Sequence, residues 1–417
     1  MIDLVKEKLN RTLAIIGQGY VGLPLAMAAV EAGWTVVGVD IFEEKVTAIN
    51  SGLSPIEDVS NEQLHEAIAN GSYSATTDFA QVAKASVITL CVPTPLNAKR
   101  EPDVSMLLAA AKQLAPYIAN ETLIVSESTS FPGTLRKLLI PEIELLKPAD
   151  AKNLYYATAP ERVNPGDLIW NQKNTPRLVG GIDQNSRTRA VSFYASICDE
   201  VVPVNSPEIA EAAKLLENTF RLVNIALINQ VTQLCAADSI DVNEVIDAAA
   251  TKPYGYMPFR PGVGVGGHCI PVDPLYLTWW GRENGVVADL VNSADTINAE
   301  MPRYVAQRAL NLIDGTIKNP RVLILGVAYK PGVGDVRETP MKELRNTLTN
   351  FGAEVAWHDP LVSTWEGTSQ VGIDWDCDLA IFANIQPGMD IKRILAKGIP
   401  ILDCVNSQFK SPNLNLL

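Results

Sequence analysis

A glycine turn between an apolar strand and an apolar helix constrains this chain more than any other feature. The turn Gly17-Gln-Gly-Tyr-Val-Gly22 follows an expected strand at 13–16 and precedes an expected helix at 23–32. Such a G-x-G-x-x-G turn lets the backbone approach the pyrophosphate of a dinucleotide at a helix start. The alternative is a glycine turn that holds no cofactor. A second strand, 35–39, ends at Asp40, whose carboxylate would hold ribose hydroxyls and repel a 2′-phosphate. The sequence therefore predicts binding of NAD rather than NADP.

Strands and helices continue to alternate up to residue 158. Helices are expected at 61–69, 104–118 and 135–145, and strands at 87–92, 122–127 and 154–158. This order predicts a doubly wound parallel sheet, in which ligands gather at the carboxyl ends of the strands. Two such ends carry hydroxyls near prolines, at Thr94 and Thr129. These hydroxyls suit a nicotinamide or its ribose, or else they cap the next helix.

A long helix is expected at 207–238, where the apolar period becomes helical. Four polar residues recur three or four positions apart and share one face of it: Glu211, Lys214, Asn218 and Arg221. Two interpretations stay open, a solvated face with ion pairs or a set of groups that holds an oxyanion or a phosphate. Another helix is expected at 284–312, kinked or restarted at Pro302. Two subunits are expected to meet in this helical middle, because a long apolar helix needs a partner surface.

The stretch 261–274, Pro-Gly-Val-Gly-Val-Gly-Gly-His-Cys-Ile-Pro-Val-Asp-Pro, combines glycines with reactive side chains. Its glycines let the backbone approach a ligand at angles that a side chain would forbid. A helix is expected at 275–282, which places Asp273 at its N-cap. A thiol just before a helix start is favoured as thiolate by the helix dipole. From this stretch alone, Cys269 is either the reactive atom of a site or an inert buried thiol.

A second α/β unit is expected in the last hundred or so residues. Strands are expected at 321–326, 354–357, 379–382 and 400–403, and a helix at 340–351. Lys330 and Arg337 either hold a phosphate of another nucleotide or are surface charges. The predicted fold class is α/β, with two Rossmann-like doubly wound domains joined by a long central helical segment. The expected domains are 1–205, 206–314 and 315–417.

Composition limits the remaining functions of this 417-residue chain. A net charge of −13 argues against nucleic acid or anionic membrane as a partner. The six cysteines lack metal-type spacing, which fits reduced thiols and no metal site. No apolar run reaches membrane-spanning length, and residues 1–10 do not resemble a signal peptide. We therefore expect a cytoplasmic protein.

Several stretches, taken together and in order, resemble the nucleotide-sugar 6-dehydrogenases, the family that includes UDP-glucose and GDP-mannose dehydrogenases. They span nearly the whole chain, and their collinearity is more specific than any single motif. The stretches are 17–24, 92–95, 127–129, 159–163, 214–218, 221–224, the Cys269 loop, 326–330 and 335–340. The stretches 160–163, 251–259 and 266–274 look like the branch that acts on UDP-N-acetylhexosamines, UDP-GlcNAc or UDP-ManNAc.

The resemblance implies a four-electron oxidation of the sugar C6 alcohol to a carboxylate, with two NAD molecules used in turn, in polysaccharide biosynthesis. Cys269 would form a thiohemiacetal and then a thioester. By resemblance, Lys214 and Asn218 stabilise the oxyanion, and Asp273 is the general base. Thr129 and Glu161 match residues near the nicotinamide and the catalytic water.

The resemblance also assigns binding residues. Those matched to NAD are Gly17, Gly19, Tyr20, Val21, Gly22, Asp40, Lys45, Thr94, Thr129 and Arg337. Those matched to the UDP-sugar are Glu161, Arg162, Val163, Lys214, Asn218, Arg221, Arg260, Gly266, Tyr329 and Lys330. A homodimer or a higher homo-oligomer is the implied assembly.

The chain departs from the family pattern in three places. Pro165 stands where relatives of the UDP-glucose type carry a second glutamate, 403–406 lacks an expected arginine, and 381–387 diverges. Water activation is therefore not assigned to position 165, and no uridine contacts are assigned in the carboxyl-terminal unit. Selectivity for a 2-acetamido group is not readable from the side chains, so UDP-glucose or GDP-mannose stays open as the substrate. Two other classes also stay open: a two-electron hydroxyacid dehydrogenase, which has no need of Cys269, and a non-catalytic nucleotide sensor, which has no need of the catalytic set.

Overall fold

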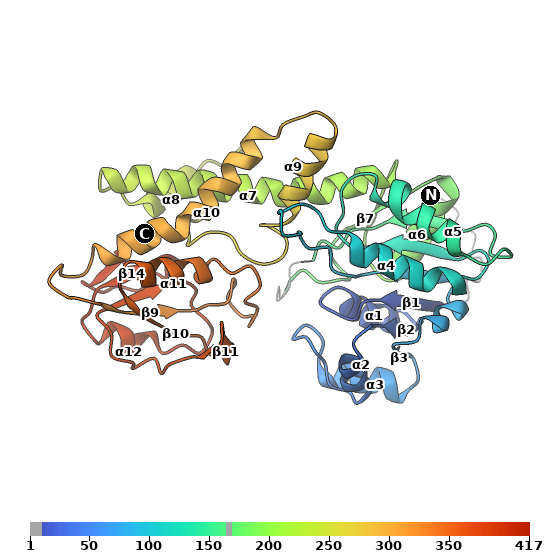
Figure 1. The fold of residues 1–417 in the computed structure, drawn as a ribbon, viewed down its shortest axis with the longest axis horizontal. Coiled ribbons are helices and arrows are strands. Elements are labelled where there is room, and N and C mark those ends of the chain that lie inside the picture. The colour runs from blue at the N-terminus through green and yellow to red at the C-terminus, as the bar shows by residue number, and fades with distance from the viewer. Residues whose placement is uncertain (1–10, 164–168) are drawn as a thin grey trace. The chain divides into compact units, whose positions relative to one another are not determined.

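The computed structural model describes residues 11–163 and 169–417 and contains two compact units (Figure 1). The first unit runs to Leu216 and also contains Leu275–Glu283. The second unit comprises Glu217–Pro274 and Asn284–Leu417. Each unit is built around its own sheet, so the predicted fold class is confirmed.

The sheet of the first unit has the strand order β3-β2-β1-β4-β5-β6-β7-β8. Its strands are β1 (Thr12–Ile16), β2 (Thr35–Val39), β3 (Tyr73–Thr76), β4 (Val87–Leu90), β5 (Leu123–Ser126), β6 (Tyr155–Thr158), β7 (Arg177–Gly181) and β8 (Val201–Val204). The order of the first six strands reverses between β1 and β4, where a doubly wound sheet binds its ligand. β4 and β5 are buried along their whole length, as central parallel strands are.

One edge of this sheet departs from the parallel arrangement predicted from the sequence. β6 pairs with β7 in antiparallel fashion, whereas the neighbouring pairs run parallel. The reversal brings the start of β7 to the edge where β5 and β6 end. The sequence analysis did not anticipate β3, β7 or β8.

Helices cover both faces of this sheet and bury two apolar clusters against it. They are α1 (Gly22–Glu31), α2 (Glu43–Asn50), α3 (Asn61–Ala69), α4 (Ser105–Leu114), α5 (Ile140–Leu146), α6 (Gln184–Tyr194) and the short 3₁₀ turns Phe79–Lys84 and Ala115–Tyr117. The predicted helix at 135–145 begins as a π-helical segment, Leu135–Leu139, before α5. Pro141 lacks the N–H that would continue a regular ladder, which accounts for the irregular start.

Helix α7 (Pro207–Ala237) is the long helix predicted at 207–238, and it contributes residues to both units. In the second unit, α8 (Val242–Ala250) and α10 (Asp289–Leu310) pack against it through Leu222, Ala226, Ile228 and their neighbours. Pro302 lies inside α10, as expected, although α10 begins at Asp289 and not at 284. α9 (Asp273–Glu283) follows the glycine-rich stretch.

The sheet of the second unit has the order β10-β9-β13-β14-β15 and is parallel throughout. Its strands are β9 (Arg321–Leu325), β10 (Glu354–His358), β13 (Leu379–Phe382), β14 (Ile401–Asp403) and β15 (Leu414–Leu416); β11 (Thr364–Trp365) and β12 (Thr368–Ser369) form a separate hairpin. α11 (Met341–Asn350) and α12 (Ile391–Leu395) complete the unit. None of the helices within residues 11–163 and 169–417 is long and apolar enough to span a membrane.

Candidate active site

The glycine turn lies between β1 and α1, at the point where the strand order of the first sheet reverses. Gly17 has a φ of +96°, and a Cβ there would lie 2.5 Å from the carbonyl oxygen of Cys91, just after β4. A Cβ on Gly22 would lie 1.8 Å from the carbonyl oxygen of Gly17. At Gly19, by contrast, no described atom outside the adjoining backbone lies within 4 Å of a Cβ position. The turn is closed by Gly17 and Gly22 and open at Gly19, which fits the pyrophosphate of NAD.

Asp40 directly follows β2 and lies beside this turn, as predicted. Its Oδ2 accepts hydrogen bonds from the Gln18 backbone N at 2.9 Å and from Lys45 Nζ at 2.8 Å. Gln18 itself is buried, and its Oε1 accepts a hydrogen bond from the Tyr73 hydroxyl. The sequence analysis did not single out Gln18, because the glycine pattern treats its position as variable. Its amide holds the turn against the sheet, with Tyr20 and Val21 half-buried nearby.

The ends of β4 and β5 are joined through Ser128. Its hydroxyl oxygen accepts a hydrogen bond from the Val92 N–H at 3.0 Å and lies 2.8 Å from the Val92 carbonyl oxygen. Thr94 and Thr129 are half-buried in the loops that leave these two strands. The structure therefore brings the two predicted hydroxyl-bearing loops to one edge of the sheet, next to the glycine turn.

The first turns of α7 anchor the loop that follows Thr129. Glu211 accepts hydrogen bonds from the backbone N–H of Gly133 at 2.6 Å and of Leu135 at 3.1 Å. Burial raises the pKa of Glu211 to about 7, although both N–H groups favour its charged form. Lys214, one turn further on, is also buried. These two members of the stripe are therefore not part of a solvated face.

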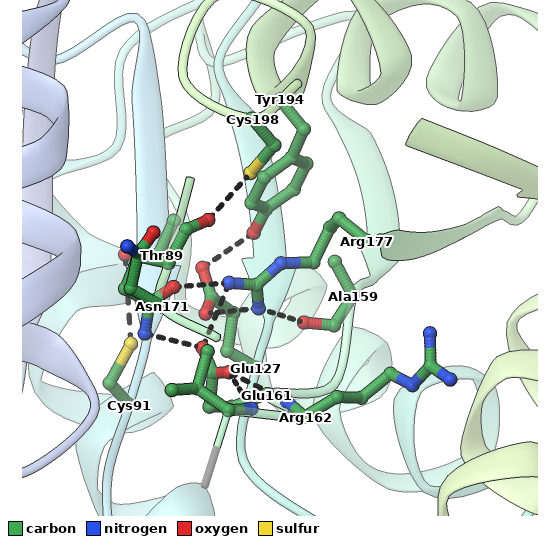
Figure 2. Close-up of polar contacts among 12 residues, drawn as sticks. Thr89, Cys91, Glu127, Ala159, Glu161, Arg162, Asn171, Arg177, Tyr194 and Cys198 are labelled. Atoms are coloured by element: carbon green, nitrogen blue, oxygen red, sulfur yellow. Dashed lines mark hydrogen bonds and ion pairs between the residues drawn. The ribbon is translucent and has the colours of Figure 1, made fainter. Parts of the chain in front are cut away.

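A buried cluster of charged groups lies where β5, β6 and β7 meet (Figure 2). Arg177 forms ion pairs with Glu127 at 3.1 Å and with Glu161 at 2.8 Å. Burial disfavours the charged form of Glu161, but Arg177, hydrogen bonds and the charge of Lys214 outweigh it and lower the pKa of Glu161. Only Glu161 and Lys214 of this set were predicted as site residues. Arg177 has a weak sequence signal, a lone arginine at the head of an apolar run.

Cys269 lies in the turn that leads into α9. All six cysteines are within the described part of the chain, and Cys269 is the one that is not buried. Its carbonyl oxygen accepts hydrogen bonds from the N–H of Val272 at 3.2 Å and of Asp273 at 2.8 Å. This turn closes early, so α9 starts at Asp273 and the predicted N-cap position is wrong by one residue. An acidic residue in the first turn still suits the helix dipole.

Asn218 of α7 and Asp273 of α9 are in direct contact. Asn218 Nδ2 donates a hydrogen bond to Asp273 Oδ2 at 2.5 Å, and both side chains are buried. Two residues that were predicted from separate motifs, 55 positions apart, are thus brought together. Arg221, the last member of the α7 stripe, is exposed.

Two buried asparagines hold the start of the glycine-rich stretch. Asn229 of α7 donates from Nδ2 to Asn298 Oδ1 of α10 at 2.9 Å, and its Oδ1 accepts the Gly262 N–H at 3.1 Å. Pro302 has no N–H for the carbonyl oxygen of Asn298 four residues earlier. A Cβ on Gly264, whose φ is +141°, would lie 3.1 Å from that oxygen. Neither asparagine was predicted as functional, and each lies within a helical pattern that gives no local signal.

The same stretch lies against the loop that follows β9. Cβ atoms added to Gly266 and Gly267 would come within 2.7 and 2.9 Å of the Tyr329 side chain. Gly267 N donates to the carbonyl oxygen of Arg337 at 3.2 Å. Tyr329 and Gly266, both predicted as substrate residues, are therefore in contact within one unit.

The turn after β9 repeats the geometry of the NAD turn. A Cβ on Gly326 would lie 1.6 Å from the carbonyl oxygen of Asn384, just as Gly17 approaches Cys91. Asp359, after β10, accepts the N–H groups of Val327 at 2.9 Å and Ala328 at 3.1 Å. A single surviving glycine is thus enough to close the turn.

Gln386 lies in the divergent segment 381–387, and its side chain has defined hydrogen-bond partners. Its side-chain oxygen accepts the Gly332 N–H at 2.8 Å, and its Nε2 donates to the carbonyl oxygens of Lys330 and Val333, each at 3.3 Å. This buried amide fixes the loop that carries Lys330. The sequence analysis noted the divergence but could not assign it a partner.

Two other predicted residues have local partners. Arg260 contacts Asp247 and Asn243 of α8. Arg337 is exposed and pairs with Asp335 at 2.6 Å. Pro165, the position of a family departure, lies outside the described residues.

This chain is similar in sequence and in structure to known proteins. The sequence matches three models of the UDP-glucose/GDP-mannose dehydrogenase family: the NAD binding domain over residues 11–198, the central domain over 208–300 and the UDP binding domain over 323–384. A UDP-N-acetyl-D-mannosamine dehydrogenase from Methanococcus aeolicus is 35% identical over 374 residues, covering 88% of this chain and 82% of the relative.

Two further proteins show the same relationship. A UDP-N-acetyl-D-glucosamine 6-dehydrogenase from Pseudomonas aeruginosa is 32% identical over 372 residues, with 87% and 85% of the two chains covered. The solved structure of a UDP-D-ManNAc dehydrogenase from Pyrococcus horikoshii superposes with a TM-score of 0.86 at 31% identity, covering 97% of this chain and 98% of that one. The predicted family resemblance and the predicted NAD cofactor are confirmed. This chain belongs to the UDP-glucose/GDP-mannose dehydrogenase family and is an NAD-dependent nucleotide-sugar dehydrogenase.

Proposed function

We propose that this protein oxidises the C6 alcohol of a UDP-N-acetylhexosamine, UDP-GlcNAc or UDP-ManNAc, to the uronic acid. The names of the relatives support the sugar class, because they are dehydrogenases of UDP-N-acetylmannosamine and UDP-N-acetylglucosamine. The observation that carries the chemistry is Cys269. It is the one cysteine that is not buried, and it lies in the turn that positions the Asp273 of the Asn218–Asp273 pair.

The reaction balances as two two-electron oxidations followed by a hydrolysis. The alcohol loses a hydride from C6 and a proton from its oxygen, which leaves an aldehyde. The Cys269 thiolate adds to the aldehyde carbon, and the resulting thiohemiacetal loses a second hydride to become a thioester. Water then cleaves the C–S bond, which releases the carboxylate and the thiol. Each of two NAD molecules, bound in turn, accepts one hydride.

The side chains of α7 suit the charge that develops at C6. Lys214 and Asn218 are one turn apart on this helix and so share a face. A buried ammonium and a carboxamide N–H stabilise an oxyanion, and Asp273, bound to Asn218, accepts a proton. The assignment of Thr129 and Glu161 to the nicotinamide side and the water stays a prediction.

The proposed NAD contacts all lie in the first unit, apart from Arg337. Gly17, Gly19 and Gly22 with Tyr20 and Val21 form the pyrophosphate turn, and Asp40 with Lys45 holds the adenosine ribose. Thr94 and Thr129 lie at the edge where the nicotinamide would be held. The NAD contact of Arg337 and the domain limits 1–205, 206–314 and 315–417 stay predictions.

We assign sugar-nucleotide contacts to the residues around the glycine-rich stretch and to the loop after β6. Support comes from the packing of Gly266 on Tyr329 and from the Gln386 amide that holds the Lys330 loop. The assigned residues are Glu161, Arg162, Val163, Lys214, Asn218, Arg221, Arg260, Gly266, Tyr329 and Lys330.

The stoichiometry of NADH tests this function. The purified chain is given limiting UDP-GlcNAc, UDP-ManNAc, UDP-glucose or GDP-mannose with excess NAD. We expect two NADH and one uronate per molecule of one UDP-N-acetylhexosamine, and little turnover of the other sugars. One NADH per substrate would instead indicate a two-electron dehydrogenase, and no turnover of any of the four would indicate a sensor.

Replacement of Cys269 tests the covalent step. Cys269→Ala should form no uronate, because no thioester can form. Cys235→Ala is the matched control, since Cys235 lies on α7 in the same unit and is buried against α8. It should keep the two-NADH stoichiometry. Full uronate production by Cys269→Ala would refute covalent catalysis.

We also propose that two copies of the chain associate through α7, and that the protein is cytoplasmic. Phe220, Leu227 and Leu234 recur every seven residues on α7, and Leu227 and Leu234 are 57% and 66% exposed. An apolar stripe at this spacing suits packing against another helix, and a second copy of the chain is the commonest partner. Light scattering should show a dimer that Leu227→Glu dissociates; a monomeric native protein would contradict the proposal. The free state of all six cysteines supports a reducing compartment.

A further inference from the structure

Arg177, the first residue of β7, is buried between two carboxylates from the loops that follow two other strands (Figure 2). Its Nη1 lies 3.1 Å from Glu127 Oε2 and its Nη2 lies 2.8 Å from Glu161 Oε2. Glu127 follows β5 and Glu161 follows β6. Because β7 runs antiparallel to β6, its first residue lies at the edge where β5 and β6 end. One guanidinium therefore joins two loops at the ligand edge of the sheet.

Glu161 passes this restraint on to the two residues that follow it. Its Oε1 accepts the backbone N–H groups of Arg162 and Val163, each at 2.6 Å. Its Oε2 accepts hydrogen bonds from Arg177 Nη2 and, at 2.7 Å, from Gln172 Nε2. Each oxygen of this carboxylate thus accepts two hydrogen bonds from protein groups. The carboxylate is thus a clamp between Arg177 and the backbone at 162–163.

The two carboxyl groups that contact Arg177 have pKa values shifted in opposite directions. Burial raises the pKa of Glu127 to about 7, and Glu127 also accepts a hydrogen bond from the Tyr194 hydroxyl at 2.5 Å. The pKa of Glu161, in contrast, is lowered despite its burial. Near neutral pH, Glu161 is therefore the fully ionised partner of the two.

We propose that Arg177 is a positioning residue for the sugar-nucleotide site, which acts through Glu161 to fix the backbone of Arg162 and Val163. This rests on the proposed function, in which 161–163 contacts the UDP-sugar. A planar guanidinium suits the task because its two nitrogens reach two carboxylates in fixed directions. A buried ion pair adds little net stability compared with apolar packing, so stability alone does not account for the cluster.

Arg177→Lys tests the proposal, because lysine keeps the charge and loses the fork. We expect KM for the UDP-sugar to rise about 10- to 100-fold, since small displacements of a positioning loop have effects of this size. The Kd of NADH, measured by fluorescence, should not change. Gln172→Leu is the second variant. It removes the hydrogen bond from Gln172 to Glu161 and the one from Arg177 to Gln172, but it leaves both ion pairs of Arg177 in place. It should raise KM in the same direction. Wild-type KM in Gln172→Leu, or in folded Arg177→Lys, overturns the proposal.

Glu127→Gln is the matched control, because it changes the other partner of Arg177 and leaves the bond to Glu161 in place. Its KM should stay at the wild-type value. If KM rises as far as in Arg177→Lys, the cluster acts through general stability and positioning is refuted.

Hydrogen exchange gives a readout that does not depend on the substrate. Amides of the peptide covering 161–163 should exchange faster in Gln172→Leu and in Arg177→Lys, while those of β1 stay protected. If the native chain oxidises none of the four sugar nucleotides, the proposed function fails while this exchange result still reports on the clamp. Unchanged exchange in both variants refutes the clamp even where the native enzyme is active.

Discussion

Asn218 donates a hydrogen bond to Asp273 across 2.5 Å, and both side chains are buried. The contact joins the middle of α7 to the first residue of α9, four positions after Cys269. A carboxamide held in this way has one N–H directed to the carboxylate and a second available for an oxyanion. The pair therefore couples a hydrogen-bond donor and a proton acceptor in one unit of the protein.

Asn218→Asp should move the pH dependence of catalysis. Two carboxyl groups at this separation cannot both ionise, so they share a proton, and the apparent pKa of the pair rises. Loss of the N–H donor should also lower kcat by about 10²- to 10³-fold at neutral pH. A pH–rate profile checks the shift. Asn218→Ala is the control, which should lower kcat without displacing the profile; identical profiles for both variants would contradict the shared proton.

Two glycines of the NAD turn should respond differently to alanine. Gly22→Ala forces a Cβ to within 1.8 Å of a backbone oxygen, so it should destabilise the protein by about 3 kcal/mol or more. Gly19→Ala meets no neighbour in the described structure, so stability should hold while the Kd of NADH rises. A lost hydrogen bond to a charged group weakens binding by about 1.5–3 kcal/mol, or roughly 10- to 150-fold. Thermal unfolding and NADH titration test both. Equal stability losses would contradict the free space at Gly19, and an unchanged Kd of NADH in Gly19→Ala would show that the ligand does not occupy it.

Asn229→Ala should loosen the glycine-rich stretch from its start. The change leaves the Gly262 N–H and the Asn298 side chain without their partner, and each orphaned buried group costs about 1–3 kcal/mol. We expect a lower thermal midpoint and a higher KM for the UDP-sugar, with the Kd of NADH unchanged. Asn224→Ala is the control, since its Nδ2 bonds only to a carbonyl oxygen of its own helix among the described residues. An unaltered KM in Asn229→Ala would mean that the stretch is held elsewhere.

The contribution of Glu211 to the free energy of unfolding should fall as the pH rises from about 4.5 to 7. Its pKa is raised from 4.5 to about 7 by burial, so the folded state keeps a proton that the unfolded state has lost. The stability from this proton is fully present below the unfolded pKa and is lost as pH rises through the folded one. Two and a half pKa units correspond to roughly 3 kcal/mol. Denaturant unfolding of Glu211→Gln across this range should show a shallower pH slope than the native chain. Glu127→Gln should remove a separate pH-dependent contribution of similar size, because the pKa of Glu127 is also raised to about 7. If the native protein and Glu211→Gln show parallel curves of unfolding free energy against pH, Glu211 does not make this contribution.

Much of the architecture was readable from contiguous residues. The expected elements at 35–39, 61–69 and 379–382 have the observed bounds, and those of α7 differ by one residue at its end. The family, the NAD turn and Cys269 followed from short motifs. The strands β3, β7, β8, β11, β12 and β15 were missed, because strands of two to five residues carry little periodic signal.

The sequence by itself determined what depends on neighbouring residues: the turn from Gly17 to Gly22, the acid at Asp40, and the thiol that precedes α9. Local backbone geometry and its side-chain requirements are encoded within a few positions. Only the tertiary structure decided which distant groups meet. The antiparallel pairing of β7 with β6 brings Arg177 to Glu161. The packing of α7 on α10 brings Asn229 to Asn298. Strand direction and helix packing are chosen by the burial of whole faces, which no single stretch of residues records.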